Sequence, residues 1–307
     1  MTGQIFAPFG LRFDRLGPAA ALAFVLRWDR RRPFGYVVTP NVDHLGRLRR
    51  GGDLRTAYGD AALCLLDSRV AAGLARICGV VPPPVVTGAD LLAAAMPALA
   101  ARAARVAVVG LDPAVMDALA ARYPGVDFTH HEPARGFEHD EAALGAAVAF
   151  VEHARADCTI LAVGSPRQEV VAQAVRRRGR AVGVGLCVGA APLFLSGALR
   201  RAPAPLRAAG LEWAWRLMHE PARLARRYLV DGPPVLLALA REFRRPALPQ
   251  PGSCAIDRSI INGMEAQCSG RLSHDGVPLV PRSARRGVPD QPRVDAPPGG
   301  GSARQGG

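Results

Sequence analysis

The chain has 307 residues, 49% of them hydrophobic and 21% charged, which is enough for one large α/β domain or two small ones. Its formal net charge is +13, and every basic residue is an arginine because the sequence contains no lysine. This charge favours an anionic partner: a phosphorylated small molecule, a nucleic acid or an acidic lipid surface. The six cysteines show no Cys-x-x-Cys pair and no metal-ligand spacing, which argues against a zinc or disulfide framework and for a reducing compartment.

The N-terminal apolar run, Leu16–Leu26, does not have the pattern of a secretory signal. Charged residues precede it, and no small-residue cleavage site follows it before Asp29. No apolar stretch reaches the roughly 20 residues needed to cross a bilayer. We therefore expect a protein that is soluble or lies on a membrane without spanning it.

Short apolar strands alternate with Ala- and Leu-rich helical stretches through the first 199 residues. This alternation predicts an α/β fold, with a Rossmann-like, mostly parallel sheet and helices on both faces. The predicted strands are Tyr36–Val38, Ala61–Leu66, Arg105–Gly110, Val126–Thr129, Cys158–Val163 and Ala181–Leu186. The predicted helices are Val42–Arg50, Ser68–Ile77, Gly88–Arg102, Pro113–Tyr123, Asp140–Ala154 and Gln168–Arg178.

The pattern changes after Gly197, where helices dominate and residues 200–245 carry a net charge of +6. The predicted helices there are Leu211–His219, Pro221–Leu229 and Pro234–Arg244. A basic, partly apolar helical segment suits an anionic membrane surface, although a hairpin packed on the core with solvated arginines is the alternative. From Pro246 onward, nine Pro and ten Gly predict a disordered tail. The expected parts are an α/β catalytic domain (1–199), a membrane-associating appendage (200–245) and the tail (246–307).

Candidate site residues follow the predicted strands, because ligands of open parallel sheets bind beyond the carboxyl ends of the strands. They are small residues, amide and hydroxyl donors and one carboxylate, which suits a phosphorylated, hydroxyl-rich ligand. The set is Thr39, Asn41, Asp67, Gly110, the run Gly164-Ser165-Pro166-Arg167-Gln168-Glu169, and Gly189.

Asp67 is the sharpest candidate, since it ends an apolar strand whose surroundings could raise its pKa toward that of a general base. Its alternative role is to cap the helix that starts at Ser68. Thr39 and Asn41 have the same two possible roles: each either caps the next helix or binds a ligand. The turn at residues 164–169 either presents backbone N–H groups to a phosphate or is a tight strand-to-helix connection. The pair His130-His131, expected in a loop, makes a poor metal site, and no Asp-x-Asp follows a strand.

Taken together, these residues resemble the WecG/TagA/CpsF family of glycosyltransferases from about Tyr36 to Arg227. The similar segments occur in family order. They are Thr39-Pro40-Asn41, Asp67, Thr87-Gly88-Ala89-Asp90-Leu91, Gly110 to Tyr123-Pro124-Gly125, Gly136-Phe137, Gly164 to Glu169, Val188-Gly189-Ala190-Ala191, Ser196-Gly197, Arg201-Ala202-Pro203, Gly210-Leu211-Glu212-Trp213, Arg216, Glu220-Pro221, Arg223 and Arg226-Arg227. Each motif is weak alone, but so many in order are specific.

The resemblance implies an inverting, metal-independent transfer from a UDP-sugar, carrying N-acetylmannosamine or a hexose, without a cofactor. The implied acceptor is a polyprenyl-diphosphate-linked saccharide in exopolysaccharide or cell-surface polymer synthesis, at the cytoplasmic face of the membrane. It also implies that Asp67 is the base and that Thr39 and Asn41 are catalytic residues in contact with the donor or the acceptor. The implied substrate contacts are Gly110, Phe137, Gly164, Pro166, Gln168, Glu169, Gly189, Arg216, Arg223 and Arg226. A homo-oligomer is left open.

Three positions depart from the family pattern. Ser68 follows Asp67 where the family has Gly, Val85 stands where many members have Arg, and Pro192-Leu193 replaces a frequent Phe-Asp. A family member that has lost activity is therefore one alternative. A Rossmann-type oxidoreductase is disfavoured because Gly-x-Gly-x-x-Gly is missing. A nucleic-acid binder is disfavoured because the sequence lacks aromatic stacking platforms and a recognition helix, so no nucleic-acid partner is expected.

Overall fold

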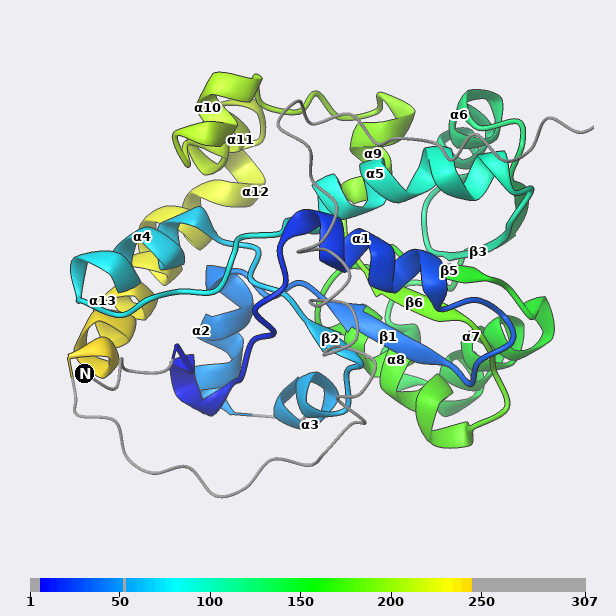
Figure 1. Cartoon of the computed structure of the whole chain (residues 1–307), viewed down its shortest axis with the longest axis horizontal. Coiled ribbons are helices and arrows are strands. Elements are labelled where there is room, and N and C mark those ends of the chain that lie inside the picture. Colours follow the sequence, from blue (N-terminus) through cyan, green and yellow to red (C-terminus); the bar gives the residue numbers. More distant parts are fainter. Residues whose placement is uncertain (1–5, 52–53, 245–307) are drawn as a thin grey trace, which may run out of the picture.

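Six parallel strands form one sheet in the order β2-β1-β6-β5-β3-β4 (Figure 1). The computed structural model describes residues 6–51 and 54–244, so the predicted tail 246–307 lies outside the described residues. The strands are β1 (Gly35–Val38), β2 (Leu63–Cys64), β3 (Arg105–Val109), β4 (Asp127–His131), β5 (Cys158–Leu161) and β6 (Val184–Cys187). The predicted α/β class with a mostly parallel sheet is confirmed.

Helices cover both faces of the sheet, and each face has its own apolar core. The first core holds side chains of α2 (Val42–Arg50), α3 (Leu54–Gly59), α4 (Arg69–Ile77), α7 (Glu141–Ala154), α8 (Arg167–Arg178) and α13 (Gly232–Phe243). The second holds side chains of α1 (Pro18–Arg27), α5 (Gly88–Ala101), α6 (Pro113–Arg122) and α9 (Ala191–Ser196). Short 3₁₀ turns lie at η1 (Pro8–Gly10) and η2 (Phe137–His139).

Successive strand residues point to opposite cores, as the two-residue period of a strand requires. In β1, Tyr36 and Val38 belong to the first core and Val37 to the second. In β6, Leu186 belongs to the second core and Cys187 to the first. Both faces of β1, β5 and β6 are buried, which explains why these strands are largely continuous apolar runs rather than alternating ones.

The direction of winding reverses between β1 and β6, which are hydrogen-bonded neighbours. The helix after β1, α2, packs in the first core, whereas the helix after β6, α9, packs in the second. Two helices that leave adjacent strands toward opposite faces leave a crevice at the carboxyl ends of those strands. The fold therefore places a ligand site beyond the ends of β1 and β6.

The C-terminal segment continues through α10 (Ala204–Ala208), α11 (Glu212–His219), α12 (Pro221–Ala225), a π-helical stretch η3 (Arg226–Asp231) and then α13. Figure 1 shows α10 to α12 above α4 and α13. Because Gly232 keeps helical backbone angles, the chain stays helical where the sequence predicted a break before Pro234. Among the described helices, none combines the length and apolar character needed to span a bilayer.

Helix α13 shares its core with the α/β domain. Val235, Leu239 and Phe243 are buried with side chains of α2 and α4, and the Phe243 ring packs on Phe6 near the N-terminus. A Cβ on Gly46 of α2 would lie 2.8 Å from Val235 Cγ2, so the glycine permits this close helix contact. The expected appendage, residues 200–245, thus contributes its last helix to the core of residues 1–199.

The observed elements differ from the predicted ones mainly in where they begin and end, and the structure contains helices that the sequence did not predict. Helices α1, α3, α9 and α10 were not predicted. His130 and His131 end β4 instead of lying in a loop, and they pair in register with Val108 and Val109. The sequence expectation ended this strand at Thr129 because the two polar histidines interrupt the apolar pattern.

We predict that Leu239→Ala lowers the free energy of unfolding by about 2 to 5 kcal/mol, because it opens a cavity in the core beside α2 and α4. Leu237→Ala on the same helix is the control, since Leu237 is 53% exposed and should change stability little. Urea unfolding followed by circular dichroism measures both. Equal effects of the two substitutions would contradict the placement of α13 in the core.

Candidate functional site

A cavity of about 470 Å³ opens at the carboxyl ends of four strands, β1, β2, β5 and β6. The C-terminal helices form its other wall. The predicted site residues that line it are Thr39, Asn41, Asp67, Gly164, Gln168, Gly189, Arg216 and Arg223. Residues that come from widely separated parts of the sequence therefore meet at the crevice between β1 and β6.

Asp67 follows β2 and is held beside the end of β1, where its backbone N–H donates to the Pro40 carbonyl at 3.0 Å. Its Oδ2 accepts a hydrogen bond from the Gly88 N–H at 3.1 Å. The side chain that caps α4 is Ser68, whose Oγ accepts from the Ala71 N–H at 3.0 Å. The capping alternative for Asp67 is therefore wrong, and its carboxylate lines the cavity.

Burial raises the pKa of Asp67 from 3.8 to about 7, and the hydrogen bond from Gly88 offsets only part of this rise. The nearby Glu212 carboxylate raises this pKa further, while the Arg201 guanidinium lowers it. A carboxylate with a pKa near neutrality can both hold a useful fraction of charge and accept a proton from a hydroxyl group. The environment of Asp67 thus has the electrostatics that a general base needs.

Thr39 and Gly88 are packed against each other at the end of β1. Thr39 is buried, and its Oγ1 donates to the Cys187 carbonyl at 3.3 Å, which joins the ends of β1 and β6. A Cβ on Gly88 would lie 2.9 Å from Thr39 Oγ1, so the residue between Thr87 and Ala89 has to be small. This close approach allows the Gly88 N–H to reach the Asp67 carboxylate.

Asn41 both caps α2 and lines the cavity. Its Oδ1 accepts from the Asp43 N–H at 3.0 Å, and its own N–H donates to His44 Nδ1 at 3.3 Å. The capping alternative for Asn41 is confirmed. Burial lowers the pKa of His44 to about 4, so this imidazole is neutral at physiological pH and carries its proton on Nε2.

Gln168 ties the turn after β5 to the turn after β6. Its Oε1 accepts from the Gly189 N–H at 2.9 Å, and its Nε2 donates to Glu169 Oε1 at 2.9 Å. Both side chains are buried, and burial raises the pKa of Glu169. Gln168 thereby fixes the two turns that face the cavity.

Two clusters of charge fasten the C-terminal helices to the α/β domain. Arg201 pairs with Asp90 of α5 at 2.7 Å and with Glu212 of α11 at 3.4 Å, and Arg207 reaches Asp90 at 3.3 Å. Thr87 completes this cluster by donating from Oγ1 to Asp90 at 2.7 Å.

The second cluster is centred on Asp43 of α2. It pairs with Arg47 at 2.8 Å and with Arg227 of the π-helical stretch at 3.2 Å. Arg47 also donates to the Ser165 carbonyl in the turn after β5. Arg227 and Tyr228 of the π-helical stretch line the cavity. This position agrees with the common occurrence of π-helical turns at functional sites.

A family model, described as the glycosyl transferase WecG/TagA/CpsF family, matches residues 6–248. The chain belongs to this family. None of the curated proteins searched matches it. Membership makes the protein a glycosyltransferase, a class that uses a nucleotide-sugar donor and a sugar acceptor. The matched range includes every described element, from η1 to α13.

Five predicted contact residues of the glycosyltransferase do not line the cavity. Gly110 follows β3 and Phe137 follows β4, two strands that lie on the far side of β5 from the crevice, and Phe137 is buried in the first core. Pro166 precedes α8 and Glu169 lies in the first turn of this helix, and Arg226 is exposed on η3. Ligand contact by these five residues stays a prediction.

Other cavity residues of the glycosyltransferase were not predicted as site residues. They include Thr87, Arg201, Arg207, Glu212, Trp213, Arg227 and Tyr228. Most of them lie inside motifs that carried the family resemblance, so the motifs marked them without showing which side chains face the site. Among residues 6–51 and 54–244, no group of three or more His, Cys, Asp or Glu side chains is arranged to hold a metal ion.

We predict that Asp67→Asn stabilises the fold at pH 8. A folded-state pKa of about 7, above the ordinary 3.8, means that ionisation of Asp67 favours the unfolded chain, and this penalty grows as the pH rises from about 4 to about 7. Asparagine removes the charge and keeps an oxygen for the Gly88 N–H. The free energy of unfolding should therefore rise by about 1 to 3 kcal/mol at pH 8 and by almost nothing at pH 4.

Urea unfolding at the two pH values measures this effect. Asp117→Asn, at an exposed position of α6, is the control and should have no pH-dependent effect. Equal stabilisation by Asp67→Asn at pH 4 and pH 8 would contradict a buried, charge-penalised carboxylate.

Proposed function

We propose that this glycosyltransferase moves a sugar from a UDP-sugar onto a polyprenyl-diphosphate-linked saccharide, with inversion and without a metal ion. The sugar is of the N-acetylmannosamine or hexose type, and the product serves exopolysaccharide or cell-surface polymer synthesis. The observation that carries the proposal is the Asp67 carboxylate, whose pKa is raised to about 7 and which lines a cavity with seven arginines.

The proposed reaction is a single displacement. Asp67 takes the proton from an acceptor hydroxyl group, and the oxygen attacks C1 of the donor sugar. The bond between C1 and the β-phosphate oxygen breaks, and UDP leaves with the bonding electron pair. Attack from the face opposite to UDP inverts the configuration at C1. A base whose pKa lies near the working pH is well matched to this step.

Negative charge develops on the departing diphosphate, and the arginines of the C-terminal helices lie on the cavity wall where they can stabilise it. Arg216 lies 3.9 Å from Glu220, and Arg223 donates to Glu220 from Nε at 2.7 Å. Glu220 thus holds both guanidinium groups in place. These fixed cations supply the electrostatic role that a metal ion has in other transferases.

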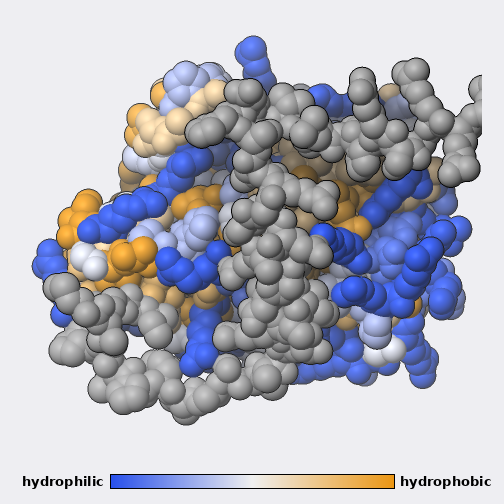
Figure 2. All heavy atoms as spheres, viewed as in Figure 1, coloured by the Kyte–Doolittle hydropathy of each residue, from blue (hydrophilic) through white to orange (hydrophobic). Residues whose placement is uncertain are grey.

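The C-terminal helices also expose apolar side chains, which supports contact with the membrane that holds a lipid-linked acceptor. Met218, Leu229 and Val230 are 68%, 59% and 62% exposed. Figure 2 shows hydrophobic residues beside hydrophilic ones over the region of α4 and α10 to α13. Apolar groups that enter the interface, with arginines at the phosphate level, are the features of a peripheral membrane surface. We place the enzyme on the cytoplasmic face.

The three departures from the family pattern bear on specificity. Ser68, in place of Gly, caps α4 without displacing the carboxylate of Asp67. Pro192, the second residue of α9, is buried, and Leu193 stands where the family often has Asp, so neither position presents a carboxylate. A carboxylate is still present on this cavity wall, because Glu212 lines it. We infer that these substitutions affect which sugar is bound more than the class of reaction.

We predict that the purified protein consumes a UDP-sugar in the presence of EDTA when a polyprenyl-diphosphate-linked saccharide is supplied. The value of kcat/KM should rise as the pH approaches 7 and then level off, because Asp67 must be ionised. Asp67→Asn should lower turnover by about 10²- to 10⁴-fold.

Release of UDP measures the rate, and NMR of the product gives the anomeric configuration. Asp117→Asn is again the control and should keep full activity. Near-normal turnover by Asp67→Asn would remove Asp67 as the base, and no turnover by the unmodified chain with any UDP-sugar would favour an inactive family member.

We predict that replacing Met218, Leu229 and Val230 with serine releases the protein from anionic vesicles. Substitution is the sharper test here than truncation near Leu211, because truncation would also remove α13 from the core. Co-sedimentation with vesicles of phosphatidylglycerol and phosphatidylcholine measures binding, and pure phosphatidylcholine vesicles are the control for charge. Unchanged binding by the triple variant would contradict a membrane contact through α11 and η3.

A further inference from the structure

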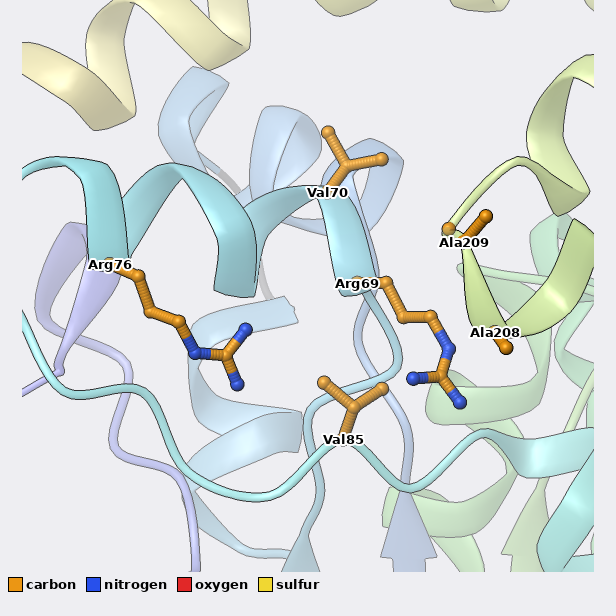
Figure 3. Close-up of a pocket in the computed structure, with 7 residues that line it drawn as sticks. Arg69, Val70, Arg76, Val85, Ala208 and Ala209 are labelled. Carbon is orange, nitrogen blue, oxygen red and sulfur yellow. The ribbon is translucent and has the colours of Figure 1, made fainter.

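A second cavity, of about 280 Å³, adjoins the catalytic one. It lies between α4, the loop that carries Val85 and the end of α10 (Figure 3). The two cavities share Arg69, Val70 and Gly210 as lining residues, so a ligand could extend from one into the other. The mechanism proposed above uses no residue that is confined to this second cavity.

Two arginines of α4, Arg69 and Arg76, line the second cavity. They are seven residues apart, which places them on the same side of a helix two turns from each other. Figure 3 shows both guanidinium groups extending away from α4 toward the loop of Val85, whereas Val70 points the other way. Ala208 and Ala209 on the opposite wall are small, which leaves room beside Arg69.

Arg69 differs from most arginines of the catalytic cavity in having no charged partner. Arg201, Arg207, Arg216, Arg223 and Arg227 each pair with a carboxylate. Within the described residues, neither Arg69 nor Arg76 has an ion pair or a hydrogen bond. Their positive charge is therefore available to a ligand.

The position of Arg69 in α4 also indicates a ligand. It is the first residue of the helix, directly after the N-cap Ser68. The N-terminus of a helix carries a partial positive charge, which disfavours a cation and favours an anion. An anion bound by Arg69 would remove this conflict, since it would interact favourably with both the guanidinium group and the helix end.

We propose that Arg69 and Arg76 form a subsite for a diphosphate group beside the catalytic cavity. Guanidinium groups bind phosphate oxygens through paired hydrogen bonds, and two of them suit a group that carries charge at two phosphorus centres. The proposal rests on the proposed function for the source of the diphosphate, which is either the lipid-linked acceptor or the UDP donor.

The test compares the unmodified protein with Arg69→Ala/Arg76→Ala and with Arg69→Lys/Arg76→Lys. Arg177→Ala is the matched control, because Arg177 is exposed on α8 away from both cavities. Calorimetry measures binding of inorganic pyrophosphate, farnesyl diphosphate and UDP, with farnesol and uridine as the phosphate-free counterparts. Circular dichroism verifies that each variant is folded.

We expect the double alanine variant to bind pyrophosphate at least tenfold more weakly. The lysine variant, which keeps the charge but loses the paired hydrogen bonds, should bind with intermediate affinity, and Arg177→Ala should keep full affinity. If, of the two organic diphosphates, only farnesyl diphosphate also binds more weakly to the alanine variant, the subsite belongs to the acceptor. If only UDP binds more weakly, it belongs to the donor. Unchanged binding of all three ligands by the alanine variant, or no binding by the unmodified protein, would overturn the proposal.

The pyrophosphate measurement separates this proposal from the proposed function. Weakened pyrophosphate binding by the alanine variant, in a protein that transfers no sugar, would leave the subsite standing and reject the transferase reaction. If the protein transfers sugar but its pyrophosphate binding does not depend on Arg69 and Arg76, the transferase reaction would stand and the subsite would be rejected.

Discussion

The pairing of β1 with β6 is the constraint on which the site depends. Because α2 and α9 leave these adjacent strands toward opposite faces, neither of these two helices covers the strand ends between them. Thr39 donates a hydrogen bond to the Cys187 carbonyl at the ends of these two strands, and the Gly189 N–H lies in the turn that follows β6. Asp67 joins them from β2, which is the other neighbour of β1. The strand order thus brings a carboxylate to the rim of the crevice before any ligand is present.

Burial of Asp67 depends in turn on the charge cluster around Arg201. By pairing with both Asp90 and Glu212, Arg201 holds α11 over the site and closes it from that side. The same contact brings one more carboxylate, Glu212, near Asp67 and balances it with a guanidinium group. The C-terminal helices therefore tune the acidity of a residue that belongs to the α/β domain. They supply both a cationic wall and the low-polarity surroundings that a proton acceptor needs.

Much of the fold and part of the site could be predicted from the sequence. Strands and long helices were found because their apolar periods are local, and Asp67, Gln168 and Gly189 were found because each follows a strand. The order of the strands is not local, so the sequence could not show that the ends of β3 and β4 lie away from the crevice, with Gly110 and Phe137. The choice between capping and ligand contact was equally hidden, since Asn41 and Ser68 cap helices while Asp67 does not. The core position of α13 depends on contacts with Gly46 and Phe6, which are far away in the chain.

The contact between the two ends of the described chain has a consequence for how the protein is made. Phe6 packs on Phe243, and the Phe9 N–H donates to Glu242 Oε1 at 2.8 Å. The N-terminal residues therefore lack part of their native contacts until α13 has been synthesised and docked. During synthesis, the first core stays open at α2 and α4 while the sheet and the second core can already form. Docking of α13 is then a late step that completes the packing of the N-terminal segment and of the first core together, so a chain interrupted before α13 would leave the apolar faces of α2 and α4 partly uncovered.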